Sequence, residues 1–164
     1  TIELLTTRPL RDIEIVMGKY LANLTLVLFA LLPTLLYYYT VHQLGSPIGN
    51  LDSGAIQGSY IGLFLLAGVY TAIGGFASSL IDNQIVSFIL ATFLCFFMYS
   101  GFLFISKLPF FFRTSDTIVQ MFGLDYHYGS ISRGVVDTRD IIYFISVIAL
   151  FVGMTLVSLE KRKW

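Results

Sequence analysis

The fold is decided by residues 1–41, which run TIELLTTRPLRDIEIVMGKYLANLTLVLFALLPTLLYYYTV. Charged side chains are confined to the first half of this stretch, up to Lys19, and residues 20–41 contain no Asp, Glu, Lys or Arg. A helix of about 20 consecutive apolar residues is long enough to cross a bilayer. We therefore expect residues 1–19 to lie at the membrane surface, on its cytoplasmic side, and residues 20–41 to span the membrane.

Pro9 is predicted to break the surface stretch, with a short helix before it and the start of a membrane-entering helix after it. Pro9 disfavours helical conformation in the residue before it and suits the first turn of a new helix, which Thr7 can cap. The simpler interpretation of this second helix is a solvated juxtamembrane segment. The alternative is a segment that binds a cytoplasmic partner and transmits its motion to the membrane helices. Its apolar face is predicted from residues that recur at three- and four-residue steps, namely Leu10, Ile13, Met17 and Tyr20.

Composition extends the membrane prediction to the whole chain. Of its 164 residues 56% are hydrophobic and only 12% are charged, against about 25% charged in a soluble domain. Charges cluster between four charge-free runs, as expected because a charge at the centre of a span costs about 2.5–3.5 kcal/mol on insertion. The chain is predicted to be an all-α membrane protein, a single domain over residues 1–164, with spans at residues 20–41, 58–81, 84–106 and 140–159.

The distribution of Lys and Arg predicts the orientation. Four spans place both ends on one side, and six basic residues lie near those ends: Arg8, Arg11, Lys19, Lys161, Arg162 and Lys163. The positive-inside rule then puts both ends in the cytoplasm. The net charge of zero gives no basis for nucleic-acid binding. Because the sequence begins without methionine, we expect it to continue a longer chain, with further spans upstream.

Residues 107–139 form the long segment on the outer side. The segment is too apolar for a solvated linker, and we expect one or two short helices on the outer leaflet. Asp116 is predicted to cap the first and Gly123 to end it. Asp137, followed three residues later by Asp140, resembles a capping box for the last span.

Small residues mark the second predicted span. Residues 67, 71, 75 and 79 are spaced by four, and small side chains at this spacing allow helices to approach closely in lipid. We predict packing between helices of this chain, with a subunit seam or a substrate path as the alternative. The stripe consists of Ala67, Thr71, Gly75 and Ser79, flanked by the pairs Gly58–Gly62 and Gly68–Ala72. In the first span, Pro33 predicts a kink.

Several kinds of chemistry have no motif in this sequence. The P-loop, HExxH and GxSxG patterns are absent, as are Cys or His residues at metal spacing. The predicted spans carry almost no charge, which argues against a proton or ion relay. Asp125 with His127 is the one acid–base pair available to an enzyme, and we consider this the weakest hypothesis. No catalytic, cofactor or metal site is predicted in the chain.

Three stretches resemble a known family. They are TIELLTTRPL at residues 1–10 with DIEIV and GKYLA shortly after, SSL with NQ at residues 78–84, and SRGVVDTRDIIYF at residues 132–144. Together they are similar to ABC-2-type transporter permeases, and closest to the gliding-motility-associated branch.

The resemblance implies a six-span permease of which this chain supplies the last four. In that family a cytoplasmic loop between the second and third spans inserts into a nucleotide-binding subunit that binds and hydrolyses ATP. Carried over, the coupling residues are Thr1, Ile2, Glu3, Leu4, Leu5 and Pro9.

The implied partners are two ABC ATPase subunits, a second permease subunit in a homo- or heterodimer, the lipid membrane and an extracellular or periplasmic partner. The chain itself would be a transport subunit and not an enzyme, driving export or extracellular machinery such as gliding motility. The rival hypothesis is a scaffold membrane protein that has no ATPase partner.

Overall fold

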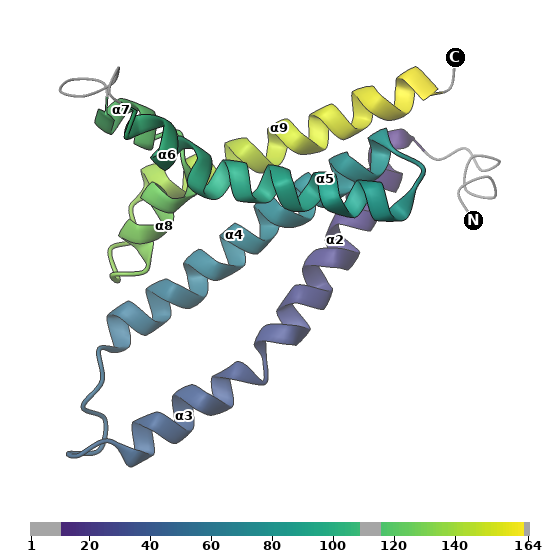
Figure 1. Ribbon diagram of the computed structural model, residues 1–164. Coiled ribbons are helices and arrows are strands. Elements are labelled where there is room, and N and C mark those ends of the chain that lie inside the picture. The colour runs from purple at the N-terminus through teal and green to yellow at the C-terminus, as the bar shows by residue number, and fades with distance from the viewer. Residues whose placement is uncertain (1–10, 109–115, 163–164) are drawn as a thin grey trace.

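The computed structural model describes residues 11–108 and 116–162, and within these ranges the chain is helical, with no β-strand (Figure 1). The four predicted spans are confirmed as four helical segments long and apolar enough to cross a membrane. Their bounds are Asp12–Leu44, Ser53–Leu80, Gln84–Ser106 and Thr138–Lys161.

The first span is broken into two helices, α2 (Asp12–Leu31) and α3 (Thr34–Leu44). The break lies at Pro33, as predicted, because proline has no N–H to continue the ladder. At the other end α2 begins at Asp12, where the backbone N–H of Arg11 donates to the carboxylate of Glu14 at 3.0 Å.

The predicted apolar face of α2 is only partly turned toward the rest of the chain. Ile13 is 51% exposed and Met17 is 37% exposed, whereas Val16, which was not assigned to that face, is 7% exposed. The helix therefore presents Val16 and Tyr20 to the rest of the chain.

Helix α4 (Ser53–Leu80) is the centre of the bundle, with α2, α5, α8 and α9 packed around it. Asp52 caps it by accepting a hydrogen bond from the N–H of Ala55 at 3.0 Å. The core is formed by buried side chains of α4, α8 and α9: Leu66, Val69, Ala72, Ile73, Leu124, Ile131, Phe144 and Phe151.

The third span contains a turn of π-helix. It runs through α5 (Gln84–Phe96), η1 (Phe97–Gly101) and α6 (Phe102–Ser106). The wider turn brings the ring of Phe97 over Gly101, where an added Cβ would stand 2.7 Å from that ring. Single π turns inside α-helices are frequent at functional sites.

Two short helices precede the last span, α7 (Asp116–Gln120) and α8 (Leu124–Ile131), and α9 (Thr138–Arg162) completes the fold. Gly123 does not end the first of them as predicted: α7 ends at Gln120, and Gly123 is the extended residue before α8. In Figure 1 α7 and α8 lie at one end of the bundle, and the start of α2, the α4–α5 turn and the end of α9 lie at the other.

Candidate functional site

Helices α2 and α9 both contact α4 at a glycine. A Cβ added to Gly68 would stand 3.2 Å from the hydroxyl oxygen of Tyr20 on α2 and 3.2 Å from Cδ1 of Ile148 on α9. The side chain of Thr71 lies beside the same Tyr20 hydroxyl. Because the missing side chain lets three helices meet within one turn of α4, a displacement of α2 would reach α9 through this contact.

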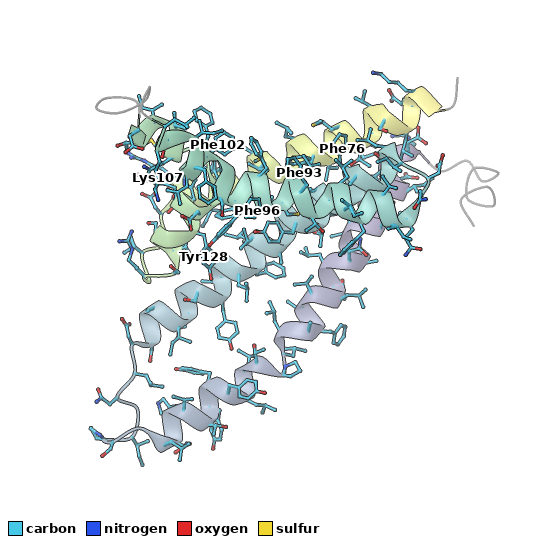
Figure 2. All side chains as sticks on the ribbon, in the orientation of Figure 1. Phe76, Phe93, Phe96, Phe102, Lys107 and Tyr128 are labelled. Carbon is cyan, nitrogen blue, oxygen red and sulfur yellow. The ribbon has the colours of Figure 1, made fainter. Side chains whose placement is uncertain are left out.

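Glycines near the start of α4 also bring this helix against α8. A Cβ on Gly58 would stand 2.2 Å from the carbonyl oxygen of Ile131 and 2.9 Å from Cα of Gly134. One turn further on, a Cβ on Gly62 would stand 3.2 Å from the ring of Tyr128, which is labelled in Figure 2. Gly134 itself has φ +86°, a conformation that favours glycine. The turn between α8 and α9 therefore rests directly on the backbone of α4.

The predicted small-residue stripe has a mixed environment. Ala67, Thr71 and Gly75 are partly buried, and a Cβ on Gly75 would meet nothing within 4 Å. Ser79 is buried, and its carbonyl accepts a hydrogen bond from the hydroxyl of Ser158 on α9 at 3.1 Å. The closest approaches lie instead at the flanking glycines, so the role of the stripe in packing stays a prediction.

A buried polar cluster fixes α8 to α9. His127 Nδ1 lies 2.7 Å from Asp140 Oδ1, and His127 Nε2 lies 2.9 Å from the carbonyl oxygen of Met121. The imidazole stacks on the ring of Tyr143, with 3.9 Å between the ring centroids, and the Tyr143 hydroxyl donates to the carbonyl of Phe122. Backbone carbonyls of the α7–α8 turn and side chains of α8 and α9 are thereby connected at one end of the bundle.

Both ring nitrogens of His127 have a partner, the carboxylate of Asp140 for Nδ1 and the carbonyl of Met121 for Nε2. The contact with Asp140 is shielded, with 13% of the His127 side chain and 9% of the Asp140 side chain exposed. Asp140 Oδ2 has no hydrogen-bond partner, so the pairing with His127 is the main compensation for burying this carboxylate.

The sequence prediction for Asp140 is therefore wrong. Asp137 does accept a hydrogen bond from the N–H of Arg139, at 2.9 Å, as a cap would. Asp140, however, turns inward to His127 and does not complete a capping box. No spacing rule links a histidine in one helix to an aspartate in the next, so only the packing of α8 on α9 reveals the pair.

A polar hollow of about 210 Å³ lies between the third span and the two short helices. Tyr99 reaches it from the π turn, Gln120 from α7, and Asp125 and Tyr126 from α8, while Arg133 follows α8. The hydroxyl of Tyr99 lies beside the carboxylate of Asp125. Asp125 lines this hollow, whereas His127 contacts Asp140 and the carbonyl of Met121. The acidic partner of His127 is therefore Asp140 and not Asp125, with which it was paired above.

The predicted coupling residues lie outside the described part of the chain. Thr1, Ile2, Glu3, Leu4, Leu5 and Pro9 precede Arg11, the first residue that the structure describes. The described part of the candidate site therefore begins at Arg11, immediately before α2. Within residues 11–108 and 116–162 no group of three or more His, Cys, Asp or Glu side chains is arranged to hold a metal ion.

Comparison with known proteins identifies the family. The model of the ABC-2 family transporter proteins matches residues 1–114, which include the stretch before α2, the α2–α4 contact and the whole of the third span. The chain belongs to the ABC-2 transporter family. No curated protein and no solved structure matches this ABC-2 chain.

Membership of the family makes the chain a multi-pass membrane subunit of an ABC transporter, not itself the ATPase. ABC-2 permeases generally work with ABC ATPase subunits in the membrane. Residues 132–144, on which the resemblance to gliding-motility permeases depended, lie beyond the matched region, and nothing in the comparisons supports that branch.

Proposed function

We propose that this ABC-2 permease receives the motion of an ATP-driven partner through residues 1–9 and passes it along α2 to α4 and α9. The single observation that carries the proposal is the contact at Gly68, where Tyr20 of α2 and Ile148 of α9 approach the same turn of α4. Tyr20 lies only nine residues after Arg11, so the contact is close to the stretch in which the coupling residues are expected. A rigid-body shift of α2 on ATP binding would thus be transmitted to both neighbours.

We further propose that both ends of the chain are cytoplasmic. The start of α2, the α4–α5 turn and the end of α9 share one end of the bundle (Figure 1), and Arg11, Lys19 and Lys161 belong to that end. The positive-inside rule orients such an arrangement with these residues in the cytoplasm of a bacterial inner membrane. The α7–α8 end would then face outward.

The exposed surface of the membrane helices indicates what kind of cargo the permease moves. Large apolar side chains along the first and third spans are exposed, including Leu26, Phe29, Phe88 and Phe93. Such surfaces suit lipid, a second permease subunit in a homo- or heterodimer, or a lipidic or amphipathic cargo. We favour this cargo. Work on an extracellular machine, as in gliding motility, is the alternative, supported by the resemblance of residues 132–144 and by the exposed apolar residues Ile118, Phe122 and Val135 around α7 and α8.

Co-purification tests the coupling proposal. The full-length chain, extracted in mild detergent, should retain an ABC ATPase subunit, and Glu3→Lys or Leu5→Asp should reduce the retained ATPase severalfold. The matched control is Leu44→Asp, since Leu44 is exposed at the end of α3, at the opposite end of the first span from Arg11. Loss of the ATPase from this control as well, or its absence from the unaltered protein, would favour a scaffold that has no ATPase.

A further inference from the structure

We propose that the hollow between the third span and α7–α8 binds a small zwitterion of the phosphoethanolamine class, with its amine at Asp125 and its phosphate at Arg133. The hollow has a volume of about 210 Å³, which is room for a headgroup of several heavy atoms. The proposal is independent of ATPase coupling.

The charges of the lining select a zwitterion over a simple ion. Asp125 and Arg133 line the same hollow, yet no ion pair joins them, although ion pairs of 4.0 Å or less are recorded between described residues. Arg133 is exposed and Asp125 is partly buried. A ligand with one charge of each sign can contact both side chains at once, which a simple cation or anion cannot.

Each side chain is held in a suitable position. The Nε–H of Arg133 donates to the carbonyl of Gly129 at 2.9 Å, which holds one edge of the guanidinium. Terminal guanidinium N–H groups are well matched to the oxygens of a phosphate. On the other side the hydroxyl of Tyr99 lies beside the Asp125 carboxylate, and Tyr126 adds an aromatic face of the kind that attracts ammonium groups.

The location fits a lipid headgroup. Tyr99 and Leu103 lie in the last two turns of the third span, and Lys107 follows its end. The hollow is therefore at the depth where a membrane helix meets the headgroup layer. The π turn at Phe97–Gly101 contains Tyr99, which lines the hollow. The proposed role of this departure from α-helical geometry is therefore to place Tyr99 at the ligand.

Lipid binding to the purified full-length chain tests the proposal. Native mass spectrometry of the protein in detergent, titrated with phosphatidylethanolamine, phosphatidylcholine or phosphatidylglycerol, should show preferential retention of phosphatidylethanolamine. Phosphatidylcholine lacks the N–H donors for Asp125, and phosphatidylglycerol lacks the amine. Asp125→Asn and Arg133→Gln should each weaken phosphatidylethanolamine binding about tenfold or more, because each removes a charge-assisted hydrogen bond.

Matched controls separate recognition from loss of folding. Arg139→Gln and Asp52→Asn change exposed residues outside the hollow, and both should bind like the unaltered protein, with the same elution volume and helical circular dichroism in all variants. Soluble phosphoethanolamine distinguishes the source of the ligand: competition at micromolar concentration would indicate a free zwitterion, and its failure to compete would indicate the bilayer lipid. Equal binding of phosphatidylglycerol, or equal binding by Arg133→Gln and Arg139→Gln, would overturn the proposal.

Discussion

Replacing Gly58 by alanine should detach the α8–α9 turn from α4. The added Cβ would stand 2.2 Å from the carbonyl oxygen of Ile131 and 2.9 Å from Cα of Gly134, and both are backbone atoms that cannot rotate away. Overpacking of this kind typically costs about 1–3 kcal/mol. Alanine in place of glycine within a helix gains back about 0.5–1 kcal/mol. The net effect expected is a destabilisation of about 1–2 kcal/mol, concentrated where α8 meets α4.

Limited trypsin digestion measures this local opening, because Arg133 lies in the affected turn and is exposed. When opening and closing are faster than cleavage, the rate follows the population of the open form, so ~1.4 kcal/mol corresponds to about tenfold faster production of the fragment that ends at Arg133. Gly75→Ala is the matched control, since its Cβ would meet nothing within 4 Å, and it should be cut no faster than the unaltered chain. Equal cutting of the Gly58 and Gly75 variants would refute the close contact.

Two further substitutions test the other contacts. His127→Ala leaves the carboxylate of Asp140 buried and unpaired, so thermal unfolding in detergent should show that the free energy of unfolding falls by about 3 kcal/mol. Adding Asp140→Asn to this variant should recover part of the lost stability. If the effects of the two substitutions simply add, the pairing is contradicted. Gly68→Leu should displace Tyr20 and reduce the ATPase activity stimulated by the permease severalfold, whereas Gly74→Leu, a helical glycine with open space around its Cβ position, should leave that activity unchanged.

The sequence predicts the spans well because their signal is local. Runs free of charge coincide with the four long helices, and the break in the first span lies at Pro33, where a hydrogen bond cannot form. The two short helices before the last span were also predicted from turn and cap residues. In each case the position of the helix or of its break depends on residues within one or two helical turns.

Predictions about which side chains face one another were less successful. Ile13 and Met17 share a helical face by spacing, but Val16 is the residue that packs, because the direction of burial depends on where α4 lies. Asp140 has the spacing of a capping residue, yet it pairs with His127. Gly123 precedes α8 and does not terminate α7. Each outcome depends on a partner that is distant in sequence.

Hydropathy and charge in the sequence alone determined a four-span helical membrane protein, because the cost of placing a charge or an unpaired backbone group in lipid is set residue by residue. The tertiary structure alone decided that α4 is the central helix, that Gly58, Gly62 and Gly68 are its points of closest approach, and that Asp125 and Arg133 share a hollow. Lipid is as apolar as the helices it surrounds, so the choice of neighbours is left to shape and to a few polar contacts between distant segments.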